Sequence, residues 1–171
     1  KIICDEFIKN CKISVTEGIQ FYEKHKNTID QQTIDTVLNN ACKINDLILL
    51  RIFSEKNLIT NYQNLFINSL HSGYLAIINW IYNKISIFFL DIENNIIYDK
   101  LNNKAQTWIS DTKRKENIFR QLMNMVKVSD LDTIKLFYQY NKKIIKEQFK
   151  RGHFNTILLN FQDRCEIFKW C

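Results

Sequence analysis

The chain of 171 residues carries 24 Lys and Arg against 18 Asp and Glu, a formal net charge of +6, and 46% of its residues are hydrophobic. That apolar content is enough for a packed core. The longest apolar run, 85–90, is far too short to cross a bilayer, so we expect neither a membrane span nor a signal peptide.

Six segments share one pattern, which predicts six helix-turn-helix units in a single repeat domain. In chain order the units lie near 5–30, 33–60, 62–90, 92–111, 116–150 and 154–171. The clearest copy is 72–82, with Trp80 as its anchor residue. Its equivalents lie 28 to 34 residues apart and are Phe21, Ile52, Trp108, Leu136 and Trp170. Such spacing is typical of stacked supersecondary units that cannot bury an apolar face alone.

The residues around each anchor alternate between apolar and polar columns, as a helix with one packed stripe requires. The residue after the anchor is apolar or aromatic, and the residue before it is polar. We therefore expect the anchors themselves to point into the core. Seven positions before the anchor, five of the six residues suit the N-cap of a second helix. These six are Ser14, Asn45, Gly73, Leu101, Ser129 and Asp163.

A first helix is predicted by apolar residues ten and fourteen positions before the anchor, such as Cys42 and Leu38 in the second unit. The fourth unit is the weakest, because its four Asn residues are poor helix formers. An irregular insertion over 84–111 is the alternative there. We expect the fifth unit to begin at 112–116. The run 85–90 is interpreted as a buried connector, or alternatively as an exposed strip for a partner.

The order of residues over 72–82 resembles the ankyrin-like repeats that are abundant in large DNA viruses. A Gly, an aromatic residue, a Leu, two branched aliphatics, a polar residue and Trp-Ile succeed one another. Similar runs occur at 45–53, 129–137 and 167–170. The Thr-Pro-Leu-His opening of typical ankyrin units is absent. The resemblance implies an all-α, ankyrin-like solenoid that binds other proteins, with no catalytic residues.

Net positive charge is concentrated in the last third of the sequence. Residues 1–111 hold 11 Lys and Arg against 12 Asp and Glu, whereas 112–171 hold 13 against 6. We interpret the basic block as a partner-binding site, most simply for an acidic protein surface. Its residues are Lys142, Lys143, Lys146, Lys150 and Arg151. Nucleic acid is an alternative ligand, but aromatic residues are not interleaved with the block as a base-stacking platform needs.

No set of residues predicts catalysis, a metal site or a cofactor. The three His residues are isolated from one another, and there is no Gly-rich loop. The five cysteines, an odd number without a CxxC pair, are Cys4, Cys11, Cys42, Cys165 and Cys171. We expect buried, reduced thiols, and hence a reducing compartment such as the host cytoplasm or a virion.

The sequence therefore predicts a non-enzymatic protein-protein interaction scaffold, of viral origin, that binds a host protein. A structural component of a virion or another large assembly is the first alternative, and a nucleic-acid binder that uses the basic C-terminal third is the second. Because solenoids need polar capping units, the start at Lys1 and the anchor at Trp170 lead us to expect a segment of a longer solenoid.

Overall fold

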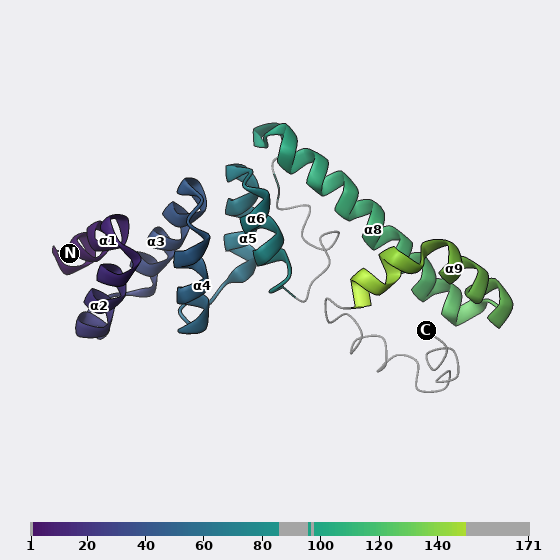
Figure 1. Ribbon diagram of the computed structural model, residues 1–171, viewed down its shortest axis with the longest axis horizontal. Coiled ribbons are helices and arrows are strands. Elements are labelled where there is room, and N and C mark those ends of the chain that lie inside the picture. The colour runs from purple at the N-terminus through teal and green to yellow at the C-terminus, as the bar shows by residue number, and fades with distance from the viewer. Residues whose placement is uncertain (1, 86–95, 97, 150–171) are drawn as a thin grey trace. The chain divides into compact units, whose positions relative to one another are not determined.

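The computed structural model describes residues 2–85, 96 and 98–149, and the regular elements within these residues are all helices (Figure 1). The chain divides into two compact units. The first comprises residues 1–85 and 97–105, and the second comprises 86–96 and 106–171. Each unit is described by itself.

The first unit contains three antiparallel helix pairs, one for each of the first three predicted repeats (Figure 1). The first helix of each pair packs beside the first helix of the next, so that α1 contacts α3 and α3 contacts α5. The pairs are α1 (Ile2–Ile13) with α2 (Val15–His25), α3 (Gln31–Ile44) with α4 (Leu47–Glu55), and α5 (Tyr62–Ser72) with α6 (Leu75–Tyr82).

In two of the three pairs, the N-cap of the second helix is one residue later than predicted. Ser14 caps α2 as predicted, accepting a hydrogen bond from the Glu17 amide at 3.3 Å. Asn45 and Gly73 instead end the preceding helix in left-handed conformations, with φ of 62° and 71°. Asn and Gly tolerate this conformation best. The N-cap of α4 is therefore Asp46, whose carboxylate accepts from the Leu49 amide at 2.9 Å.

The core of the first unit is built from columns that recur from pair to pair. In the first helices these columns contain Phe7, Leu38 and Phe66, followed one turn later by Cys11, Cys42 and Leu70. In the second helices they contain Leu50 and Ile78, two positions before the anchor, and Phe53 and Ile81, one position after it. All of these side chains are buried.

The prediction that the anchors point into the core was wrong. Phe21, Ile52 and Trp80 are only half-buried. The positions two before and one after an anchor lie at the centre of the buried face, and the anchor itself lies roughly 100° or more around the helix from that centre. The Trp80 ring instead covers the edge of its own pair, 6.4 Å from the Tyr62 ring, with Lys84 Nζ 5.9 Å from its centroid.

The predicted fourth unit is not a helix pair in the described residues. We expected a break between Trp108 and the first helix of the fifth repeat, but α8 (Asn103–Val128) runs through 111–116 without interruption. Neither Gly nor Pro occurs within it to end the helix. A short 3₁₀ helix, η2 (Tyr98–Lys100), precedes it. Residues 92–95, and the connector 86–90, lie outside the described residues.

In the second unit, α8 packs against α9 (Leu131–Gln148) around one apolar cluster. Its buried members are Phe119, Leu122, Val126, Ile134, Tyr138 and Ile145. Asp130 caps α9 and accepts from the amides of Asp132 and Thr133 at 3.1 and 2.9 Å. The anchor Leu136 is 55% exposed, so the inward prediction failed here as well. The predicted sixth unit, 154–171, lies outside the described residues.

Candidate protein-interaction site

A groove of about 330 Å³ runs between α3 and α5, and carboxamide side chains dominate its walls. We call it the amide groove. Its lining extends from the connector before α5 to the middle of the two helices and stops at Asn39 and Asn68, before the turns that lead to α4 and α6. Its lining residues are Asp35, Leu38, Asn39, Ile59, Asn61, Asn64, Leu65 and Asn68.

The helical period explains how these residues come together. Asp35 and Asn39 are four residues apart on α3, and Asn64 and Asn68 are four residues apart on α5, so each pair shares one helix face. Leu38 and Leu65 are buried apolar lining residues of the same groove. The groove therefore has polar walls and an apolar base.

Hydrogen bonds hold several of these amides in place. Asn68 Nδ2 donates to Asn39 Oδ1 at 2.8 Å across the two helices. Asn61 is the N-cap of α5, and its side-chain oxygen accepts from the Asn64 amide at 2.9 Å. Gln31 Nε2 donates to Asp35 Oδ1 at 2.9 Å and to the Leu58 carbonyl at 3.3 Å, which ties the following connector to α3.

The chemistry of the groove suits a ligand with peptide-like hydrogen-bond donors and acceptors. A carboxamide offers two donors and a carbonyl acceptor, and each peptide group of a polypeptide offers one donor and one acceptor. Asp35 is the one ionisable side chain among the lining residues. Sequence reasoning missed this groove, although polar residues four apart on the predicted first helices were a usable signal.

The predicted basic site is described only in part. Lys142, Lys143 and Lys146 are exposed on α9, whereas Lys150 and Arg151 lie outside the described residues. Lys143 lines a second hollow, of about 540 Å³, between α8 and α9. The other lining residues of this hollow are Asp111, Arg114, Lys115, Tyr140, Asn141, Ile144 and Glu147.

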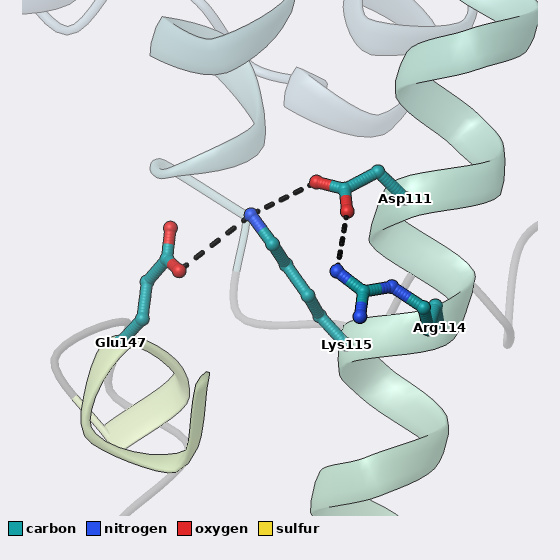
Figure 2. A network of polar contacts seen from close by, with 4 residues as sticks. All are labelled: Asp111, Arg114, Lys115 and Glu147. Carbon is teal, nitrogen blue, oxygen red and sulfur yellow. Dashed lines mark hydrogen bonds and ion pairs between the residues drawn. The ribbon is translucent and has the colours of Figure 1, made fainter. Parts of the chain in front are cut away.

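Two carboxylates offset part of the positive charge in this hollow (Figure 2). Lys115 Nζ lies 3.0 Å from Asp111 Oδ2 and 3.6 Å from Glu147 Oε2, and Arg114 Nη2 lies 3.1 Å from Asp111 Oδ1. Burial by itself lowers the pKa of Lys115, but the hydrogen bond to Asp111 and the charges of Glu147 and Asp111 raise it overall. The hydrogen bond from Lys115 lowers the pKa of Asp111 despite some desolvation.

Two of the three thiols in the first unit are buried. Cys11 and Cys42 are buried, as their repeat column predicted, and Cys4 is half-buried; none of the three forms a disulfide. Burial raises the pKa of both buried thiols to about 12, and the nearby Asp46 charge contributes at Cys11. Within the described residues, no three metal-ligating side chains gather in one place.

None of the described helices is both long enough and apolar enough to cross a bilayer. No protein-family model, curated protein or solved structure matches the chain. The amide groove and the exposed lysines of α9 are therefore the observations on which a function can rest.

Proposed function

We propose that the chain is a non-enzymatic protein-interaction scaffold built from ankyrin-like repeats, of viral origin, and that the amide groove holds an extended segment of a partner protein. The observation that supports this proposal is the row of Asn side chains along the walls of the groove. The stack of three similar helix pairs supports it too, because a stack of repeats offers a long binding surface.

An extended segment fits the groove because its peptide groups present donors and acceptors at regular intervals, while its side chains alternate in direction. The four Asn carboxamides pair with the peptide groups, and Leu38, Ile59 and Leu65 receive a small apolar side chain. Asp35 favours a Lys or Arg at one end of the segment. A groove of 330 Å³ is at the small end for a binding pocket, so it holds only a few residues.

The lysines of α9 provide a second contact in this proposal, to an acidic region of the partner. Lys142 and Lys146 are four residues apart and share a helix face, whereas Lys143 lies beside the carboxylate-containing hollow. If nucleic acid were the ligand instead, the logarithm of the binding constant would fall steeply and linearly with the logarithm of the salt concentration. A salt titration with a DNA duplex and an RNA duplex therefore separates the two ligands.

A photo-crosslinking residue introduced in place of Asn64 tests the groove directly. The control carries the same residue in place of Gln139, which is exposed on α9 outside the lining of both hollows. In a host-cell lysate we expect a defined protein adduct at position 64 and not at position 139. Asn39→Ala should reduce the adduct at position 64. The absence of an adduct there, or identical adducts at both positions, would contradict the proposal.

A further inference from the structure

Large apolar side chains are exposed at the turns within the helix pairs. Of the ten exposed large apolar side chains in the described residues, seven lie at or beside such a turn. These seven are Ile13, Ile44, Ile48, Tyr74, Leu75, Val128 and Leu131. Single exposed apolar residues are common on protein surfaces, but in the first unit five of the six lie at the turns, which is typical of a surface that becomes covered.

The three turns of the first unit follow one another along one edge of the stack. α3 and α5 run in the same direction, because α4 is antiparallel to α3 and the chain then reverses again into α5 (Figure 1). Lys12 of α1 lines a shallow hollow together with Ile44 and Asp46 of the next turn. We call residues 12–17, 43–48 and 71–75 the turn edge (Figure 1).

Charges flank the apolar side chains in the same order at the first two turns of the turn edge. A basic residue occupies the last turn of each first helix, namely Lys12, Lys43 and His71. An acidic residue stands at the start of the second helix in the first two pairs, namely Glu17 and Asp46. Interaction with the helix dipoles favours this sorting of charge. At its first two turns the turn edge thus carries a basic side (Lys12 and Lys43), an apolar centre and an acidic side (Glu17 and Asp46). The third turn has no acidic residue, and its Gly73 lies against Asn102.

The same order recurs at the turn between α8 and α9 in the second unit. Lys127 lies in the last turn of α8, Val128 is 83% exposed, and Asp132 lies in the first turn of α9. Helix dipoles account for the charges alone. They do not account for isoleucines that are 61 to 67% exposed at Ile13, Ile44 and Ile48.

We propose that the turn edge binds the turn edge of a second copy of this chain, around a two-fold axis parallel to the stack. Rotation about that axis lays the apolar centres on each other and brings the basic side of one copy over the acidic side of the other. Lys12 then faces Glu17 of the second copy, and Lys43 faces Asp46. A two-fold axis across the stack would place the basic sides together, which like-charge repulsion disfavours.

Such an interface is isologous, so it closes at a dimer. It leaves the amide groove open, because none of the residues that line the groove belongs to the turn edge. The dimer is therefore independent of the proposed partner binding. The dimer is also one way in which copies of this chain could assemble if it is a structural component of a larger assembly.

Sedimentation equilibrium of the full chain over a range of micromolar concentrations tests the dimer. We expect a reversible monomer-dimer equilibrium that Ile44→Asp abolishes over this range. Leu136→Asp is the matched control, because Leu136 is an exposed aliphatic residue of α9 outside the turn edge, and it should leave the equilibrium unchanged. A monomer at every concentration, a dimer that survives Ile44→Asp, or equal losses in both variants would overturn the proposal.

A charge swap tests the orientation of the two copies. Lys12→Glu and Glu17→Lys should each raise the dimer Kd by about tenfold, since two attractive pairs become repulsive in a symmetric interface. The double variant should return the Kd to within about threefold of the original. A double variant as weak as the single ones overturns the parallel two-fold arrangement. Far-UV circular dichroism shows whether each variant keeps its helices, and adduct formation at position 64 reports separately on the amide groove.

Discussion

Asn68 of α5 donates a hydrogen bond of 2.8 Å to Asn39 of α3, and this bond joins two successive helix pairs at the wall of the amide groove. Both side chains are partly accessible to solvent, so water competes for the same donors and acceptors. The bond therefore shapes the groove more than it stabilises the stack.

We predict that Asn68→Ala lowers the free energy of unfolding by roughly 0.5–1 kcal/mol, the net value of an ordinary hydrogen bond. Asn39→Ala should cost a similar amount. Because the two residues share one bond, the double variant should cost less than the sum of the two single costs. Urea denaturation measures all three variants. Strict additivity would show that the bond is absent in solution.

Ile78 and Trp80 are two residues apart on α6, and the burial of their side chains differs: Ile78 is 0% exposed and Trp80 is half-buried. We predict that Ile78→Ala costs about 3–4 kcal/mol, as for a fully buried aliphatic side chain. Trp80→Ala should cost less, about 2 kcal/mol, because part of the indole already faces water. Urea denaturation of the two variants gives the order. If Trp80→Ala lowered the free energy of unfolding more than Ile78→Ala does, Trp80 would be a core residue after all.

The example of Trp80 shows what could be predicted from the sequence. Apolar columns such as that of Phe7, Leu38 and Phe66 recur at helical spacing, and this recurrence predicted both the helix pairs and the buried positions. A large aromatic residue is easy to recognise in a sequence at any position, whereas its burial depends on its angular position around the helix relative to the buried face. Phe21, Ile52 and Trp80 therefore occupy similar places on the second helices of three pairs, as predicted, but they were assigned wrongly to the core.

The amide groove could not be predicted in the same way. Its walls come from two helices, and the recurrence of apolar columns predicts which side chains are buried but not how far apart neighbouring helices lie. The fourth unit failed for a different reason. The polar residues over 111–116 were interpreted as the start of a new helix. They instead lie within α8, where Asp111 and Lys115 form an i,i+4 ion pair at 3.0 Å that stabilises the continuous helix.

Gly18 of α2 lies against Cys11 of α1, and a Cβ atom there would lie 2.5 Å from Cys11 Sγ and 3.0 Å from Cys11 Cα. We predict that Gly18→Ala destabilises the first helix pair by about 1–3 kcal/mol through overpacking, although alanine favours the helix itself. Cys11→Ala in the same chain removes the sulfur contact but leaves the backbone contact. The double variant should therefore recover part of the loss in thermal denaturation. A stabilising effect of Gly18→Ala alone would show that α1 and α2 are farther apart.

The ion pairs of Lys115 should make stability depend on pH at both ends of the range. The pKa of Asp111 is lowered in the folded chain, so its contribution is present above the ordinary Asp pKa of about 3.9 and is lost as the pH falls through the lower folded value. The pKa of Lys115 is raised, so its contribution is present below about pH 10.4 and is lost as the pH rises through the folded value.

We predict that Lys115→Met removes a contribution of about 0.5 kcal/mol near neutral pH, a small value because Asp111 and Glu147 are about half exposed and screened by water. The variant should also lose part of the acid dependence of stability that the wild-type chain shows. Urea denaturation at neutral and acidic pH measures both effects. Lys113→Met, at a position outside the ion pairs that join Asp111, Lys115 and Glu147, serves as the control. An equal pH dependence in Lys115→Met and the wild type would contradict the role of the network.

The buried thiols of Cys11 and Cys42 should react with alkylating reagents far more slowly than Cys4. Only the thiolate is a good nucleophile, and burial raises the pKa of both thiols from 9.0 to about 12, so almost none is ionised near about pH 8. Iodoacetamide labelling followed by peptide mass spectrometry measures each cysteine separately. Urea at a denaturing concentration should bring all three rates close together, because unfolding removes the desolvation. Rapid labelling of Cys42 in the native chain would show that the second helix pair opens readily, since this side chain is 0% exposed.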